Sequence, residues 1–356
     1  MADKSWKTKG KSSPAGKIDL GTLDRIESDR KVARLETRLK IAEDKAECLA
    51  KEVEEYRLRE EVADRLSASG PTRKWPISKP SRGKTPVSAI VNYSDWHLEE
   101  NVDKATVNGL NEYNPKIAER RVKRIFEKTA DYIEWFTPGA EVLYMGLLGD
   151  FITGYIHEEL LESNHMAPIE AADWAVDLIC SGVEYLRKRK VVKRIISPTA
   201  VGNHGRTTPK KRIKTSCKNS YEWGMYRQIA RLYRNDPFYD IRVCQGYHMH
   251  TEIYGRTVRW HHGDAIRFGG GVGGITIPAN KKIAGWNDSP IPASLDLFGH
   301  LHTFMDGGTF VANGSVIGHS DFGVELGAKY EPPCQSFIGF SKTRGKFLVA
   351  QMFCED

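Results

Sequence analysis

The chain of 356 residues lacks the features of membrane-inserted and disulfide-built proteins. It has no run near the roughly 18 consecutive apolar residues that a membrane-spanning helix needs. The basic N-terminus, MADKSWKTKGKSS, is not followed by the apolar stretch of a signal peptide. The six cysteines are widely scattered and form no C-x-x-C pair, so we expect reduced, mostly buried thiols. Together these absences predict a cytoplasmic protein without membrane contact.

Acidic side chains are missing from a long basic segment inside the chain. The formal charge of +7 is uneven, because residues 1–84 carry +6 and residues 85–356 carry only +1. Between Glu184 and Glu222 there are twelve Lys or Arg and no acidic residue, so the remainder of residues 85–356 carries −11. A block of like charge is either a solvated face or a surface that binds a polyanion, and the motifs next to it in sequence indicate which interpretation is favoured.

The first 86 residues divide into three segments of different composition. Residues 1–19 are rich in Lys, Ser and Gly, and we expect a disordered basic arm there. Residues 20–68 form an expected helix, because apolar residues recur at a 3,4 spacing without Gly or Pro after Leu23. Residues 69–86 contain four Pro and five basic residues but no acid, which predicts a linker.

The expected helix has a narrow apolar seam, which leaves two interpretations open. The seam consists of Val32, Leu35, Leu39, Ala42, Ala46, Leu49, Val53 and Tyr56. One interpretation is a coiled coil that joins copies of the chain or binds a partner protein, with the flanking basic stretches on DNA. The other is packing of the helix on the remainder of the chain, since the two alanines contribute little apolar surface.

Residues 87–356 alternate short apolar runs with amphipathic helical stretches, and strands dominate toward the C-terminus. This order predicts an α/β domain with two packed sheets. We expect helices at 115–136, 167–190 and 220–234. The expected strands are 87–93, 141–148, 192–201, 241–245, 248–254, 257–261, 295–298, 309–313, 335–341 and 346–353.

Five short polar motifs each follow an apolar run of strand type. They are Ser94-Asp95-Trp96-His97, Gly149-Asp150, Gly202-Asn203-His204, His261-His262-Gly263-Asp264 and Gly299-His300-Leu301-His302. A parallel sheet collects ligands at the carboxyl ends of its strands, so these donors should meet at one edge. Carboxylates and imidazoles together suit Mn²⁺, Fe²⁺ or Zn²⁺. Two such ions sharing one carboxylate can stabilise an in-line displacement at phosphorus.

The ordered motifs resemble those of the calcineurin-like metallophosphoesterases over roughly residues 87–350. The resemblance implies a catalytic domain at 87–356 with a β-sandwich flanked by helices in αββα layers. It also implies two divalent ions, with Mn²⁺ favoured and Fe²⁺, Zn²⁺, Mg²⁺ or Ni²⁺ as alternatives. One ion would be held by Asp95, His97, Asp150 and His302, and the other by Asp150, Asn203, His262 and His300. Asp150 would bridge them, a metal-activated hydroxide would attack, and His204 would stabilise or protonate the leaving oxygen.

Two residues depart from the family pattern. Gly205 follows His204 where many members have an acidic residue, so the group that orients His204 must lie elsewhere or be absent. Thr153 stands where the protein-phosphatase branch has Asp, which argues against that branch. The motifs are closer to the DNA-repair nuclease branch and to bacteriophage phosphoesterases, and a phage-encoded chain would act in the host cytoplasm.

The position of the basic segment favours a nuclease, with DNA as the preferred nucleic acid. Five cationic side chains follow the proposed acid, His204, in sequence and could contact a phosphate backbone. They are Arg206, Lys210, Lys211, Arg212 and Lys214. His157 lies close enough to Asp150 in sequence to contact substrate, or it is a surface residue. The alternatives are a phosphatase or cyclic-nucleotide phosphodiesterase acting on small substrates, and a nucleic-acid-binding scaffold with a degenerate site.

Overall fold

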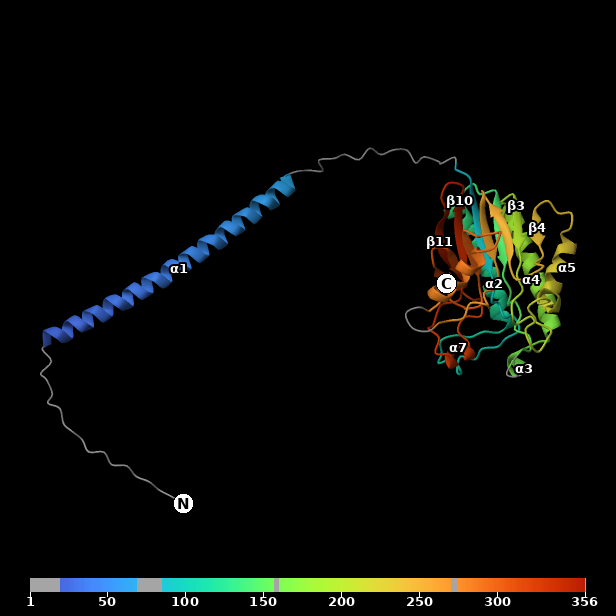
Figure 1. The fold of residues 1–356 in the computed structure, drawn as a ribbon, viewed down its shortest axis with the longest axis horizontal. Helices are drawn as coiled ribbons and strands as arrows, with labels where there is room; N and C mark the ends of the chain where they lie inside the picture. Colours follow the sequence, from blue (N-terminus) through green and yellow to red (C-terminus); the bar gives the residue numbers. More distant parts are fainter. Residues whose placement is uncertain (1–19, 69–84, 157–159, 270–273, 356) are drawn as a thin grey trace, which may run out of the picture. The chain divides into compact units, whose positions relative to one another are not determined.

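The computed structural model describes residues 20–68, 85–156, 160–269 and 274–355. The chain divides into two compact units, Met1–Arg82 and Gly83–Asp356, and Figure 1 shows the ribbon of each. The expected basic arm at 1–19, nearly all of the expected linker at 69–86 and the candidate contact His157 lie outside the described residues.

The N-terminal unit contains one long helix, α1 (Leu20–Ala68), so the predicted helix is confirmed. Glu-to-basic pairs one turn apart support it, including Glu47 with Lys51 at 2.9 Å and Glu61 with Arg65 at 2.8 Å. The apolar seam is exposed, with Leu39 at 60% and Leu49 at 59%. Self-association through this seam stays a prediction.

The C-terminal unit contains two sheets. The six-stranded sheet has the order β11-β10-β1-β2-β3-β4, and β1 to β4 are parallel neighbours. Its strands are β1 (Val87–Tyr93), β2 (Val142–Leu147), β3 (Arg194–Pro198), β4 (Tyr239–Arg242), β10 (Cys334–Ser341) and β11 (Gly345–Phe353). The five-stranded sheet has the order β5-β6-β7-β9-β8, with β6, β7 and β9 parallel. Its strands are β5 (Met249–Ile253), β6 (Arg256–Trp260), β7 (Leu295–Phe298), β8 (Met305–Asp306) and β9 (Phe310–Ala312).

Helices cover the outer faces of both sheets, which confirms the expected αββα layers. In Figure 1, α2 (Pro115–Phe136), α4 (Pro168–Arg189) and α5 (Tyr221–Leu232) lie along the six-stranded sheet, and one apolar core joins them to it. A second core lies between the sheets, and a third joins the five-stranded sheet to α6 (Thr276–Asn287). The short elements are α3 (Leu160–Ser163), η1 (Cys217–Asn219) and α7 (Asp321–Glu325).

Strand β1 shows why the layers form. Ala89, Val91 and Tyr93 pack into the helix-side core, whereas Ile90 packs into the core between the sheets. A strand alternates its side chains between two faces, so an almost wholly apolar run fits a strand that is covered on both sides. The predicted bounds of β1, α2 and β7 agree with the structure, but α6 was not predicted.

Two further observations bear on the sequence-based expectations. All six cysteines are unpaired thiols, four of them buried, as expected. Over the ranges that the structure describes, no helix has both the length and the apolar character required to cross a membrane.

Candidate metal centre

The five polar motifs meet at one edge of the two sheets. They follow β1, β2, β3, β6 and β7, each at the carboxyl end of its strand. Backbone hydrogen bonds join the first two motifs, from Asp95 N to Gly149 O at 3.0 Å and from Trp96 N to Asp150 O at 2.8 Å. The sheet order therefore places donors that are up to about 200 residues apart in sequence next to one another.

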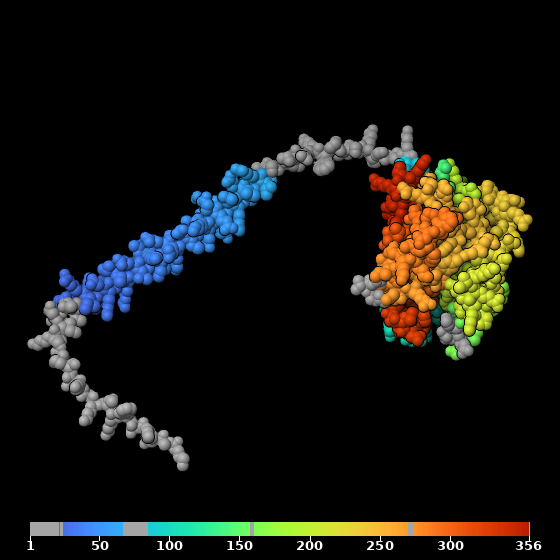
Figure 2. All heavy atoms as spheres, viewed as in Figure 1, coloured from blue at the N-terminus to red at the C-terminus, as the bar shows by residue number. Residues whose placement is uncertain are grey.

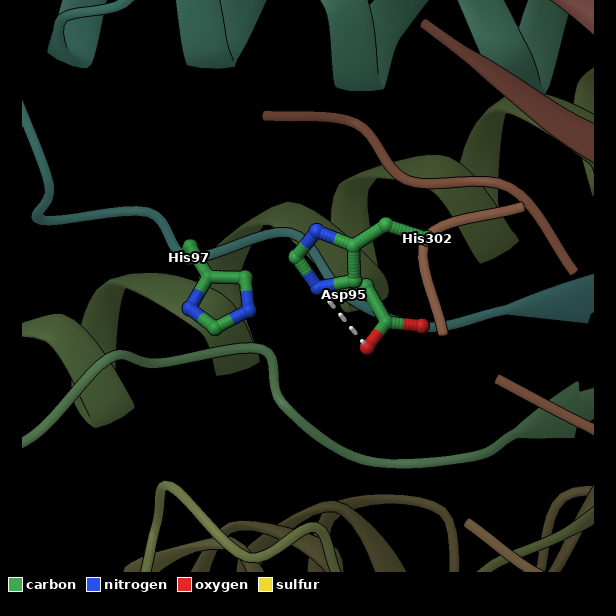
Figure 3. A group of neighbouring side chains, drawn as sticks. All are labelled: Asp95, His97 and His302. Atoms are coloured by element: carbon green, nitrogen blue, oxygen red, sulfur yellow. Dashed lines mark ion pairs between the residues drawn. The ribbon is translucent and has the colours of Figure 1, made fainter. Parts of the chain in front are cut away.

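The donors form three overlapping groups, within each of which the ligand atoms lie no more than 4.8 Å apart. The groups are Asp95 with His97 and His302, His97 with Asp150 and His204, and Asp150 with His262 and His300. Figure 3 shows the first group, with the imidazole of His302 directed at the Asp95 carboxylate, 3.4 Å from its Oδ1. Asp150 and His97 each belong to two of the groups, and of the two only Asp150 has two carboxylate oxygens with which to bridge a pair of ions.

The backbone at the candidate ligands is strained. Five of the eight non-glycine residues with positive φ in the described structure are candidate ligands: Asp95, His97, Asp150, His300 and His302. Such conformations cost about 1–3 kcal/mol each and persist where the surrounding structure enforces them. Here they turn the chain sharply at strand ends and direct the side chains inward.

Two glycines permit the close approach of these loops. A Cβ atom at Gly202 would meet the Asp150 carboxylate, and one at Gly299 would meet the Asp95 carboxylate. The glycine before Asn203 and the one before His300 are therefore required by packing, because each lies directly against a candidate bridging or terminal ligand.

His97 has the hydrogen bonding of a metal ligand. Its Nδ1 lies 3.0 Å from Thr153 Oγ1, and that hydroxyl donates to Glu100 Oε2 at 3.2 Å, so Nδ1 carries the proton. The lone pair is then on Nε2, which is buried and has no hydrogen-bond partner among the described residues. An unpaired buried nitrogen facing carboxylates fits a divalent cation.

His262 brings together the second half of the centre. Its Nδ1 donates to Leu148 O at 2.8 Å, and its Nε2 lies 2.9 Å from Asp150 Oδ2 and 3.0 Å from Asn203 Oδ1. Burial alone lowers the pKa of His262, but the Asp150 carboxylate outweighs it and raises the pKa to about 10. His262 Nε2, Asp150 Oδ2 and Asn203 Oδ1 thus lie close together. A divalent cation that bound among these three atoms would replace the proton on Nε2.

Burial keeps other imidazoles in the neutral form that metal ligation requires. It lowers the pKa of His300 to about 4 and holds the pKa of His97 well below its usual value. The pKa of the Asp150 carboxyl is raised by burial but lowered more by the neighbouring histidines, so the group is ionised. The centre combines ionised carboxylates with imidazoles, of which His97 and His300 are neutral, and this set of ligand types suits borderline divalent ions.

His204 is oriented by a backbone carbonyl instead of an adjacent acid. Its Nδ1 lies 3.0 Å from Thr153 O, and its backbone N donates to Asp150 Oδ1 at 2.8 Å. Because a carbonyl only accepts, Nδ1 carries the proton and Nε2 is the basic nitrogen. The structure therefore answers the question raised by Gly205, since the orienting group comes from Thr153.

Two buried carboxylates that the sequence analysis missed brace the ligand loops. Glu222 accepts the N–H groups of Phe151 at 2.8 Å and Gly202 at 2.6 Å, and burial raises its pKa to about 8. Glu99 accepts those of Thr153 at 2.9 Å and Gly154 at 2.8 Å. In the sequence, Glu222 is the first acidic residue after the acid-free basic segment, and this position was the signal that could have pointed to its role.

The acid-free segment splits into two halves with different surroundings. In the first half, Arg187 pairs with Asp236, and Arg194 pairs with Asp240 at 2.9 Å, at the amino end of β3 and away from the ligand loops. In the second half, three of the five predicted nucleic-acid contacts, Arg206, Lys211 and Arg212, line a cavity with Asn203. Lys210 and Lys214 are exposed and are not among the described residues that line it.

Comparisons with known proteins give low similarity. No protein-family model and no curated protein matches the sequence. Solved structures that match include a Streptococcus pneumoniae protein described as a predicted phosphoesterase, with 12% identity, a TM-score of 0.30, and coverage of 74% of this chain and 97% of that one. Vps29 of Entamoeba histolytica complexed with Zn²⁺ has 10% identity, a TM-score of 0.29 and coverage of 75% and 99%. A putative 5'-nucleotidase of Staphylococcus aureus has 10% identity, a TM-score of 0.33 and coverage of 76% and 55%. At this level of similarity, the function has to be inferred from the chain's own side chains.

Proposed function

We propose that the chain is a two-metal phosphodiesterase of the calcineurin-like type that hydrolyses DNA. The observation that carries the proposal is the set of three overlapping donor groups with Asp150 shared between two of them. Asp95, His97 and His302 would hold one divalent ion with Asp150, and Asn203, His262 and His300 would hold the other with Asp150. Among these residues, His97 has a buried Nε2 with no hydrogen-bond partner in the described structure, so this nitrogen is available to bind an ion.

The chemistry follows from the residues around the centre. Two bound divalent ions would supply charge stabilisation for displacement at phosphorus and would lower the pKa of water. The His204 ring lies next to the His97 ring, with 4.8 Å between their centroids, and with a proton on its Nε2 it would assist the leaving oxygen. Arg206, Lys211 and Arg212 would bind the flanking phosphates, so affinity for DNA should fall steeply with salt.

The test of this proposal is cleavage of supercoiled plasmid, linear duplex and end-labelled single strand with Mn²⁺, Mg²⁺ or chelator. We expect Mn²⁺-dependent cleavage that is lost in Asp95→Ala, Asp150→Asn and His204→Ala. Each variant is compared with the wild type by thermal unfolding, so that a folding defect is not mistaken for lost chemistry. Intact DNA after long incubation of folded wild-type protein with Mn²⁺ would contradict the nuclease proposal.

The alternatives give different results in two simple assays. A phosphodiesterase hydrolyses bis-p-nitrophenyl phosphate faster than the monoester, and a phosphatase shows the reverse preference. A nucleic-acid-binding scaffold with a degenerate site hydrolyses neither substrate and retains less than one ion per chain on metal analysis. The filled set of donors favours the enzyme.

A further inference from the structure

A cavity of about 970 Å³ lies on the surface of α6, next to the candidate metal centre. We call it the α6 groove and define it by the residues Lys211, Arg267, Phe268, Ile277, Lys281 and Lys282. In Figure 2, the orange atoms of the part of the chain that contains α6 lie beside the yellow-green atoms of the segment that follows β3. Apart from Lys211, the residues that define the groove have no part in the proposed function.

The α6 groove adjoins the cavity that Asn203 lines. Both cavities are lined by Lys211 and Asp264, which form an ion pair with each other. Lys211 also lies 5.4 Å from the centre of the Tyr247 ring, in the first cavity. A strand bound at the candidate metal centre could therefore continue past Lys211 into the groove without leaving the surface.

The charge of the groove suits an anion. Lys211, Arg267, Lys281 and Lys282 line it, and Asp264 is the one acidic side chain among its described lining residues. That carboxylate is already paired with Lys211, so the other three cations have no acidic counterpart in the lining. The sequence from 265 to 287 contains no Asp or Glu, so this stretch adds no acidic side chain that could offset the three cations.

The groove also presents apolar surface to solvent, which phosphate binding alone would not need. Phe268 is 64% exposed and Ile277 is 66% exposed, and both lie among the cations. An exposed aromatic ring next to lysines is the arrangement that holds a nucleic-acid strand by stacking a base while the cations hold its backbone. A base in a duplex is already stacked and paired, so this surface favours an unpaired base.

We infer that the α6 groove binds single-stranded nucleic acid that extends from the candidate metal centre, with a base stacked on Phe268. The inference rests on the proposed nuclease function. It adds that the bound nucleic acid is single-stranded and that the strand lies along the α6 groove. Arg267, Lys281 and Lys282 bind its phosphates, and the Lys211–Asp264 pair lies where the strand passes from one cavity to the next.

The test locates the bound strand on the full chain. Oligothymidylate carrying 5-iodouracil is irradiated with the protein in chelator, where no hydrolysis occurs, and tryptic peptides are analysed by mass spectrometry. Trypsin cuts after Arg267 and Lys281, so a base on Phe268 marks the peptide 268–281. We expect this peptide to carry the main adduct, and unlabelled single strand to compete for it better than duplex of equal length.

Variants then measure the contribution of the groove. Phe268→Ala and the double variant Lys281→Glu/Lys282→Glu should each weaken oligothymidylate binding about tenfold, as stacking and phosphate contacts are lost. The matched control is Lys116→Glu/Lys188→Glu, which reverses two exposed charges on α2 and α4 outside both cavities and should change affinity less than twofold. All variants are compared at one salt concentration and checked by thermal unfolding.

The outcomes separate this inference from the proposed function. Adducts elsewhere, no detectable binding of the strand, better competition by duplex, or groove variants that bind as the control does would each overturn the inference. Hydrolysis of bis-p-nitrophenyl phosphate by the wild type tests the metal centre independently. If that hydrolysis is present while the groove variants bind normally, the groove inference fails and the phosphodiesterase stands.

Discussion

At the scale of single residues, Thr153 links the two parts of the proposed chemistry. Its hydroxyl lies against His97 Nδ1 and its carbonyl oxygen against His204 Nδ1, each at 3.0 Å. One residue therefore fixes the tautomer of a candidate metal ligand and of the candidate acid. The carbonyl oxygen belongs to the backbone and is present whatever residue stands at 153, whereas the hydroxyl is specific to Thr or Ser.

Replacement of Thr153 by Val should weaken metal binding about 10–100-fold, because His97 loses the group that orients it. Affinity for Mn²⁺ is measured by calorimetric titration of metal-free protein. The matched control is Thr153→Ser, which keeps the hydroxyl and should bind Mn²⁺ nearly as the wild type does. Equal affinity in the Val and Ser variants would show that the hydroxyl has no part in metal binding.

At the scale of elements, the spacing of the two sheets depends on one glycine in β2. A Cβ atom at Gly146 would lie 2.7 Å from Cε3 and Cζ3 of Trp260, a fully buried ring at the end of β6. Trp260 directly precedes His261 and His262, so the fit between these two strands also sets the position of a candidate ligand. The packing of the sheets and the geometry of the centre are thus coupled.

Gly146→Ala should destabilise the protein by about 1–3 kcal/mol, since the added methyl group overpacks the core between the sheets. The free energy of unfolding is measured in urea. The control is Gly224→Ala on α5, where a new Cβ meets no atom within 4 Å and the helix should gain about 0.5–1 kcal/mol. A Gly146→Ala variant as stable as the wild type would show that the core can expand there.

At the scale of the whole molecule, the excess charge and the proposed chemistry belong to different units. The segment 1–84 carries +6, and the C-terminal unit is nearly neutral but concentrates cations near its candidate centre. Pro86 O accepts a hydrogen bond from Lys342 N at 3.0 Å, which ties the residue before β1 to the residue after β10. The two units therefore allow separate tests of binding and hydrolysis.

Deletion of residues 1–82 should reduce the number of copies in the oligomer, because the α1 seam is the predicted contact between copies. It should also reduce the affinity for DNA and the salt dependence of that affinity. Hydrolysis of bis-p-nitrophenyl phosphate should stay nearly unchanged. Light scattering after size exclusion, DNA binding at several salt concentrations and steady-state kinetics measure the three quantities. Loss of hydrolysis in a folded C-terminal unit would show that α1 belongs to the catalytic machinery.

Much of the fold could be predicted because the relevant signals are local. Short apolar runs gave β1 and β7 and an amphipathic stretch gave α2, each with correct bounds, and the polar motifs at strand ends gave the candidate ligands. Helix α6 was missed because Pro278, Gly285 and the preceding glycines contradict a helix locally. Its formation depends on Ile275, Ala279 and Ile283 packing against the outer face of the five-stranded sheet.

The sequence by itself determined the donor types, their order along the chain and the strands that carry them, since these depend on side-chain chemistry and on periodicity. Only the tertiary structure decided which partners surround those donors. Thr153 as the group that orients His204, Glu222 and Glu99 as braces, and the division of the basic segment all arise from contacts between distant residues. Such contacts depend on how the sheets and helices pack in three dimensions, which no local pattern records.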